Sequence, residues 1–140
     1  MSTLTAVAPK STKTVSYRDL AEFMAFAQKH LADRDKEKPE TKFDYALRKV
    51  LKSCERLWTD YLETRGDIDV EHAATDKDGV IKRDDKGNLA YTKDGMKSRA
   101  TALRKLFDET VDVPVHIAEA PKGLTAEERD IFVGFVLAEG

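Results

Sequence analysis

The residues of this sequence that could do chemistry include an Asp/Gly-rich segment of the kind that binds calcium. Placing Gly79 at the sixth position of a twelve-residue calcium loop puts Asp76 and Asp78 at the third and fifth positions. The first position would then be an alanine, and the twelfth would be Asp85 where a bidentate glutamate is expected. Placing Gly87 at the sixth position puts lysines at ligand positions. We therefore interpret both segments as ordinary Asp/Gly turns.

The spacing of the histidines gives little support for a metal centre. No two of the three histidines lie four residues apart, as a helical metal site would need. We expect His30 at the end of a helix, where a cation complements the helix dipole, and His116 on the same strand face as Pro114. His72 follows three carboxylates, which strand alternation would send to the opposite face. Surface histidines are the expectation.

Nucleophilic catalysis is also unsupported. Cys54 lies in a heptad pattern of apolar residues, so we expect a small buried hydrophobic side chain and not an activated thiolate. The sequence contains neither a G-x-S-x-G motif nor a Gly-rich phosphate loop. We expect no enzymatic activity, no cofactor and no metal, and a small hydrolase or metal enzyme is the last of the alternatives.

Basic residues cluster in two regions of the sequence. Residues 96–107 contain basic residues and no acid, and a second set recurs at i, i+4 and i+8 with Lys49 alongside. If the two regions form neighbouring antiparallel helices, their basic faces could merge into a stripe suited to phosphates. The alternative is a solvated face partly neutralised by Glu55, Asp108 and Glu109. The candidate phosphate or nucleic-acid ligands are Arg48, Lys52, Arg56, Lys97, Arg104 and Lys105.

Composition favours a small folded protein. The chain has 140 residues with 24 basic and 26 acidic side chains, a net charge of −2. Its apolar residues fall in periodic clusters, which is typical of a folded domain. No apolar run approaches the roughly 18 residues that span a bilayer, and we find no secretory signal. We expect a cytoplasmic protein with a flexible tail over residues 1–15 and a single domain over residues 16–140.

Two apolar seams should dominate the fold. Ser16 is a predicted N-cap for a first helix over about residues 17–32. A longer helix is predicted over 40–65, ended by Gly66, and another over 92–108. The helices over 40–65 and 92–108 are amphipathic, and neither is stable alone. We therefore expect these two helices to pair in an antiparallel arrangement. Their predicted seams are Phe43, Leu47, Val50, Cys54, Leu57 and Tyr61, and Met96, Ala100, Leu103 and Phe107.

Shorter elements are predicted around this pair. A half-buried strand over residues 67–73 and two Asp/Gly turns should form a β-hairpin or meander within residues 67–95. Alternating valines predict an edge strand over 111–118, because Pro114 cannot donate to a ladder. Thr125 and Glu128 predict a capping box for a last helix over 125–138. We identify no internal repeat.

This layout resembles a group of small, functionally uncharacterised phage and prophage proteins. The matching segments, within residues 40–137, are ALRKVLKSCERLWTDYLETR, DKDGVIKRDDKGNLAYT, FDETVDVPVHI and GLTAEERDIFVGFV. The N-terminal helix and basic tail depart from it. The resemblance implies a viral or prophage source and no catalytic residues to carry over.

We therefore predict an α+β fold with a long antiparallel helical pair, a β-hairpin insert, an N-terminal helix, one edge strand and a short C-terminal helix. The expected function is a non-enzymatic protein–protein interaction module, phage-encoded, that binds a host or viral protein or self-associates as a homo-oligomer. The alternative is a nucleic-acid or nucleotide binder, which includes sequestration of a host immune signal. No membrane association is expected. The candidate interface residues are Trp58, Leu51, Leu62 and Tyr91.

Overall fold

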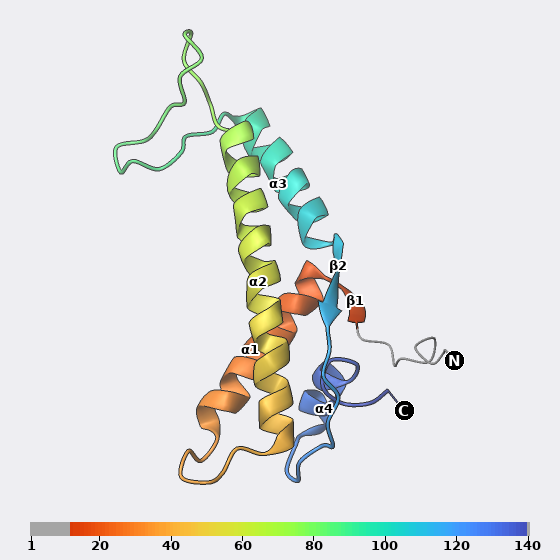
Figure 1. The fold of residues 1–140 in the computed structure, drawn as a ribbon. Coiled ribbons are helices and arrows are strands. Elements are labelled where there is room, and N and C mark those ends of the chain that lie inside the picture. Colours follow the sequence, from red (N-terminus) through yellow and green to blue (C-terminus); the bar gives the residue numbers. More distant parts are fainter. Residues whose placement is uncertain (1–11, 140) are drawn as a thin grey trace, which may run out of the picture. The chain divides into compact units, whose positions relative to one another are not determined.

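The computed structural model of the chain describes residues 12–139, which form two compact units (Figure 1). Unit 1 holds residues 12–58 and 110–139, and unit 2 holds Thr59–Glu109. The predicted α+β fold is confirmed, whereas the single domain over residues 16–140 stays a prediction. The elements are β1 (Thr12–Ser16), α1 (Tyr17–Asp33), α2 (Lys42–Glu71), α3 (Lys93–Phe107), β2 (Thr110–Pro114) and α4 (Ala126–Phe132).

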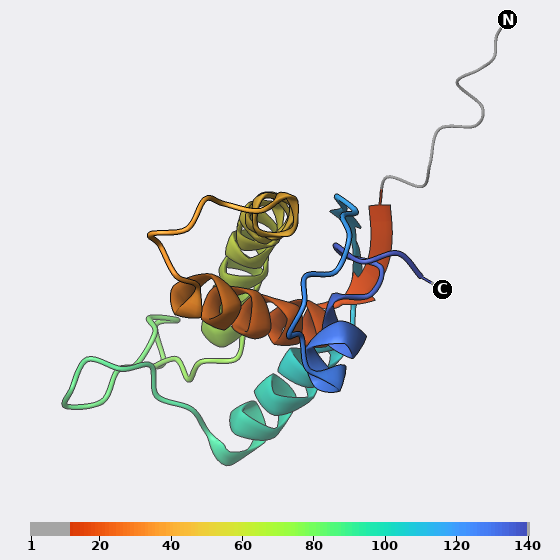
Figure 2. The same ribbon diagram turned by 90° about the horizontal axis from the view of Figure 1, so that it is seen from below.

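The core of unit 1 forms where α1, the first half of α2, α4 and the strands meet. The hydroxyl of Ser16 accepts a hydrogen bond from the backbone N–H of Asp19 at 3.1 Å, which confirms the predicted N-cap of α1. Helices α1 and α4 lie side by side in both ribbon views (Figures 1 and 2). The predicted seam of α2 is buried here, and its members in this core are Phe43, Leu47, Val50 and Cys54.

Aromatic packing joins α1 to the C-terminal segment. The Phe23 ring is fully buried and stacks on Phe135 with ring centroids 4.1 Å apart. It also meets the edge of Phe132 at 5.8 Å. Offset stacking and edge contacts of this kind add to the free energy gained by burial. Phe23 is therefore the centre of the unit 1 core.

The predicted flexible tail is wrong for its last residues, because Thr12–Ser16 form strand β1. This strand pairs antiparallel with β2, with Val15 opposite Val111 and Thr12 opposite Pro114. Val15 and Val113 are buried in the core. The ladder ends at Pro114, as predicted from its missing N–H. The rest of the predicted tail, residues 1–11, lies outside the described residues.

The last helix is shorter than predicted. Its capping box between Thr125 and Glu128 is confirmed, but α4 ends at Phe132 and not at residue 138. Gly134 has φ +85°, a left-handed conformation that side chains other than glycine rarely adopt, and the chain turns there. The following residues run beside the segment after β2, where the N–H of Ala118 donates to the carbonyl of Val136 at 2.8 Å.

In unit 2 the long helix continues beyond its predicted end. Helix α2 passes through Gly66 to Glu71, so the predicted strand over residues 67–73 is wrong. A single glycine costs a helix only about 1 kcal/mol relative to alanine, which packing can offset. Ile68, Asp69 and His72 are half-buried, and their spacing places them on one face of a helix. The alternation of apolar and acidic residues in the short Ile–Asp–Val sequence is also typical of a strand, which is why a strand was predicted here.

Helix α3 pairs antiparallel with the second half of α2. The rings of Tyr61 and Phe107 lie 6.1 Å apart, and Nε of Arg99 donates to Oδ1 of Asp69 at 2.7 Å. The predicted α3 seam is wrong in its first half, because Met96 and Ala100 are exposed while Leu106 is buried. The partners of α3 thus lie at residues 61–69 and not around Cys54, which packs in unit 1.

Candidate functional site

The helical pair of unit 2 exposes apolar side chains. Within this unit only Tyr61 and Leu106 are buried hydrophobic residues. Leu62 and Val70 on α2 are each 49% exposed, and Met96 on α3 is 58% exposed. Helices are stabilised mainly by packing of their apolar faces, so these exposed apolar side chains are candidates for contact with a partner. We call these three exposed residues, which lie on the two helices of the pair, the apolar surface of unit 2.

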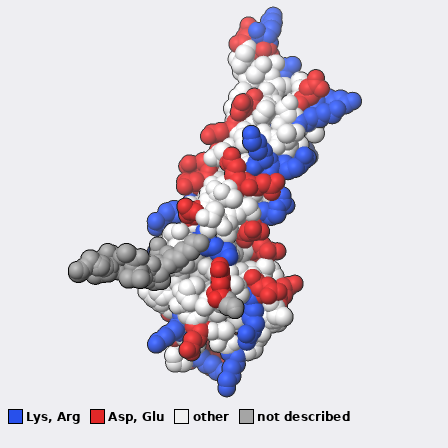
Figure 3. All heavy atoms as spheres, turned by 90° about the vertical axis from the view of Figure 1, so that its right-hand side faces the viewer, with Lys and Arg blue, Asp and Glu red and all other residues white. Residues whose placement is uncertain are grey.

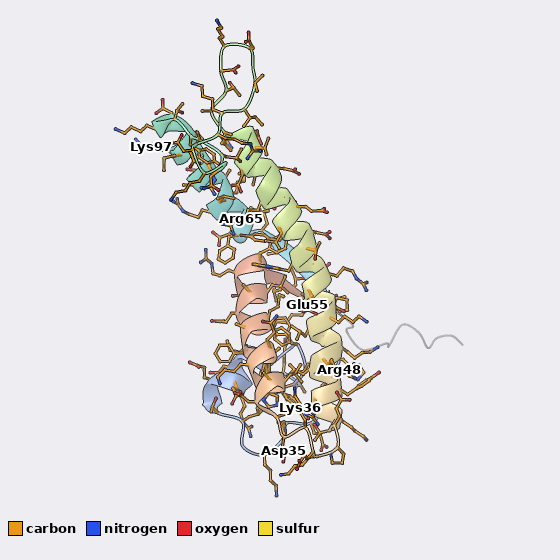
Figure 4. All side chains as sticks on the ribbon, turned by 90° about the vertical axis from the view of Figure 1, so that its left-hand side faces the viewer. Asp35, Lys36, Arg48, Glu55, Arg65 and Lys97 are labelled. Atoms are coloured by element: carbon orange, nitrogen blue, oxygen red, sulfur yellow. The ribbon has the colours of Figure 1, made fainter. Side chains whose placement is uncertain are left out.

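The two helices beside the apolar surface carry opposite charges. Residues 59–71 contain five acids and one base, a local net charge of −4. Helix α3 contains five bases and one acid, a local net charge of +4. The Arg99–Asp69 pair joins the two helices within the unit. Lys97 points away from α2 (Figure 4), so part of the basic face of α3 is open to solvent.

The four predicted interface residues have different environments. Leu62 is exposed, and its place in an interface stays a prediction. Leu51 is wrong as an interface candidate, because it is buried in the core of unit 1. Trp58 is half-buried and packs against that core. The hydroxyl of Tyr91 donates to the carbonyl of Asp69 at 3.2 Å and its ring lies under Arg99, so this residue stabilises unit 2.

The six basic candidates are divided between the units. Arg48, Lys52 and Arg56 belong to unit 1. The other three, which belong to unit 2, are Lys97, Arg104 and Lys105. The merged basic stripe therefore stays a prediction. Arg48 lies on the side of α2 turned away from α1 (Figure 4) and donates two hydrogen bonds to the Glu40 carboxylate, at 2.9 and 3.2 Å. On the face drawn in Figure 3, acidic and basic side chains are interspersed.

The insert between α2 and α3 contains an eight-residue repeat that the sequence analysis missed. In each copy one aspartate, Asp76 or Asp84, accepts two backbone N–H groups through its Oδ1. Both glycines have φ +82°, and each turn is closed by an antiparallel bridge. Backbone hydrogen bonds link Ala74, Lys82 and Ala90 in a ring. The repeat is visible in the sequence, where TDKDGVIK is followed directly by RDDKGNLA.

A second cluster surrounds His30 in unit 1. Its Nε2 lies 3.4 Å from Oδ1 of Asp44, and its Nδ1 lies 3.5 Å from Oε2 of Glu128. Asp44 and Glu128 each stand in the first turn of a helix, where Thr41 and Thr125 are their capping partners. His30 therefore connects the end of α1 to the beginnings of α2 and α4. The predicted helix-end position of His30 is confirmed, but it is half-buried.

The protein environment lowers the pKa values of both carboxyl groups. Burial of Asp44 works against its charged form, but hydrogen bonds from Thr41 and Arg34 and the nearby His30 outweigh it, so the pKa lies below its ordinary value. The backbone N–H of Thr125 is the largest cause of the lowered pKa of Glu128, which burial partly opposes. By contrast, burial raises the pKa of the Cys54 thiol to about 12, as expected for an inert cysteine.

These lowered pKa values predict that acid destabilises unit 1. A carboxyl group whose pKa is lower in the folded state stabilises that state above its unfolded pKa and loses this contribution as the pH falls through the folded pKa. We expect the free energy of unfolding to decrease below about pH 4.5, the ordinary value for Glu128. Urea unfolding at a series of pH values measures this decrease. Asp44→Asn should flatten it and cost roughly 1 kcal/mol at neutral pH. An unchanged slope in Asp44→Asn would contradict the assignment.

Comparisons with known proteins do not assign the chain to a family. No protein family model, curated protein or solved structure matches the chain. Within residues 12–139, no helix has the length and apolar character needed to cross a membrane. Over the same range, His, Cys, Asp and Glu side chains form no group that could hold a metal ion. The phage resemblance stays a prediction.

Proposed function

We propose that the protein is a non-enzymatic protein–protein interaction module and that unit 2 binds the partner. The apolar surface formed by Leu62, Val70 and Met96 carries this proposal. Such a surface on a helical pair with only two buried hydrophobic residues is completed when a further protein covers it. A phage-encoded protein acting in the host cytoplasm fits this role, in keeping with the resemblance.

A second copy of the chain is the first partner expected. Two antiparallel helical pairs can pack as a four-helix bundle, and in a two-fold dimer the same surface meets itself. The charges favour this arrangement: α2 is acidic over 59–71 and α3 is basic, so α2 of one copy can face α3 of the other. An interface built in this way would bury the apolar surface and pair Lys97 with the acidic residues of its partner.

The oligomeric state of the full chain tests this proposal. Sedimentation velocity over about a hundredfold range of concentration should show reversible dimer formation. The double variant Leu62→Asp/Met96→Asp should remain monomeric, because it places charges in the interface. Val80→Asp is the matched control, since Val80 is 60% exposed but lies on the insert. A wild-type monomer throughout the range, or a double variant that dimerises equally well, would overturn self-association.

A partner other than a second copy gives a different result. The wild-type protein would then stay monomeric, and affinity purification from the native host would recover a protein that Val80→Asp retains and Leu62→Asp/Met96→Asp loses. That outcome would support the interaction module and replace the second copy by the recovered protein. Equal recovery by both variants would overturn the role of the apolar surface.

A further inference from the structure

A basic pocket lies in unit 1. One face of α2 contributes Lys49, Lys52, Ser53 and Arg56. The last residue of β2, Pro114, and the two residues after it, Val115 and His116, close the pocket. Its volume is about 310 Å³. Three cationic side chains from successive turns of a helix thus surround a space that is large enough for a phosphate group.

Two cations of this pocket have no acidic partner in the described part of the chain. Lys52 and Arg56 form no ion pair with any residue that the structure describes. Between residues 45 and 58 the sequence contains a single acid, Glu55, against four bases. Arg48, by contrast, pairs with Glu40. Unpaired cations gathered at a concave surface raise the local potential and attract anions.

An exposed aromatic ring adjoins the basic pocket. Tyr45 is 41% exposed, and the edge of its ring meets His116 at 5.6 Å between centroids. Arg48 and Lys49 lie against the same ring, at 5.4 and 5.7 Å from its centroid. His116 borders the basic pocket and also a groove of about 780 Å³, which Tyr45 lines together with Phe43, Ala118 and Pro121. The groove lies within the usual size range of sites for small molecules.

We propose that this part of unit 1 binds a nucleotide, either free or within a single-stranded nucleic acid. The phosphate occupies the pocket formed by Lys49, Lys52 and Arg56. Ser53 also lines this pocket, and its hydroxyl donates to the carbonyl of Lys49 at 3.4 Å. The base lies in the groove and stacks on Tyr45, since every base offers a flat face to an aromatic ring. This arrangement explains why the pocket's cations and an exposed tyrosine lie together on one face. It goes beyond the proposed function, which uses unit 2.

Binding of three probes to the full chain tests the proposal. The probes are a fluorescein-labelled oligothymidylate followed by anisotropy, and AMP and inorganic phosphate followed by calorimetry. We expect the oligonucleotide, AMP or both to bind, and binding by only one of them identifies which source of the nucleotide the site takes. With one phosphate held in the pocket, the logarithm of the oligonucleotide binding constant should fall with a slope of about −0.7 against the logarithm of salt concentration. Binding of neither nucleotide probe would overturn the proposal.

Variants distinguish binding in the basic pocket from nonspecific electrostatic attraction to the rest of the protein. Lys52→Ala/Arg56→Ala should weaken nucleotide binding at least about tenfold, because two charge-assisted contacts are lost. Lys36→Ala/Lys38→Ala removes equal charge from the exposed α1–α2 connection and should have little effect. Tyr45→Ala should weaken binding of the nucleotide probes and leave that of phosphate unchanged. Equal losses in the pocket and control variants, or undiminished AMP or oligonucleotide binding in Tyr45→Ala, would overturn the site.

The wild-type protein provides a check that needs no substitution. In a heteronuclear NMR titration, the nucleotide probe that binds should shift the amide signals of residues 45–56 and 115–118. Shifts confined to α3 would overturn the location. The variant Leu62→Asp/Met96→Asp should bind nucleotide like the wild-type chain, so failure of self-association and failure of this site are distinguishable.

Discussion

Replacing Phe23 by alanine lowers the free energy of unfolding of unit 1 by about 3–5 kcal/mol. The Phe23 side chain is fully buried, and its ring contacts those of Phe132 and Phe135. Removing it leaves a cavity at the point where α1, α4 and the C-terminal segment meet. Urea unfolding followed by circular dichroism measures the loss.

Phe26 is the matched control for this substitution. It lies on the same helix but is only partly buried against the core. Phe26→Ala removes the same type of side chain from a partly solvent-exposed position, and we expect the free energy of unfolding to fall by about 1–2 kcal/mol. Equal losses for Phe23→Ala and Phe26→Ala would contradict the placement of Phe23 at the centre of the core.

Replacing Gly95 by alanine destabilises unit 2 by about 1–3 kcal/mol, although alanine normally stabilises a helix. A Cβ atom at this position would lie 2.8 Å from the carbonyl oxygen of His72 and 3.1 Å from Oγ1 of Thr92. The carbonyl belongs to the backbone just after α2, so it cannot move aside as a flexible side chain would. The hydroxyl of Thr92 is the N-cap of α3. The substitution therefore disturbs the beginning of α3.

Gly66→Ala is the control for Gly95→Ala, and we expect it to change the stability of unit 2 in the opposite direction. It is an exposed glycine within α2, and a Cβ atom there would meet no atom within 4 Å. Gly66→Ala should stabilise unit 2 by about 0.5–1 kcal/mol because it lowers the entropy of the unfolded chain. Hydrogen exchange of α3 measures both changes. If Gly95→Ala also slowed exchange, the close approach of α3 to the end of α2 would be contradicted.

The local features of this fold could be predicted from the sequence. The N-caps Ser16 and Thr125 were predicted correctly, because a capping hydrogen bond joins residues only a few positions apart in the sequence. The seam from Phe43 to Tyr61 is buried as its spacing predicts, except for Leu57, which is half-buried. These signals lie within one or two helical turns, so no knowledge of distant residues was needed.

The features that depend on distant residues were missed. Strand β1 has a partner that lies 98 residues away, at Asp112 opposite Thr14, and its short Thr-rich sequence has no alternation. The continuation of α2 past Gly66 is held by the Asp69–Arg99 pair, which joins residues 30 apart. Tyr45 and His116 are likewise brought together by tertiary packing, so the aromatic part of the proposed nucleotide site was not visible in the sequence.

We propose that a partner chain covers the helical pair of unit 2. Hydrogen exchange of the wild-type protein at low and high concentration tests it most directly, because unit 2 has little core of its own to slow exchange. We expect the amides of residues 59–71 and of α3 to exchange more slowly at high concentration, and those of α1 to exchange at the same rate. Exchange rates in unit 2 that do not change with concentration would contradict self-association through this surface.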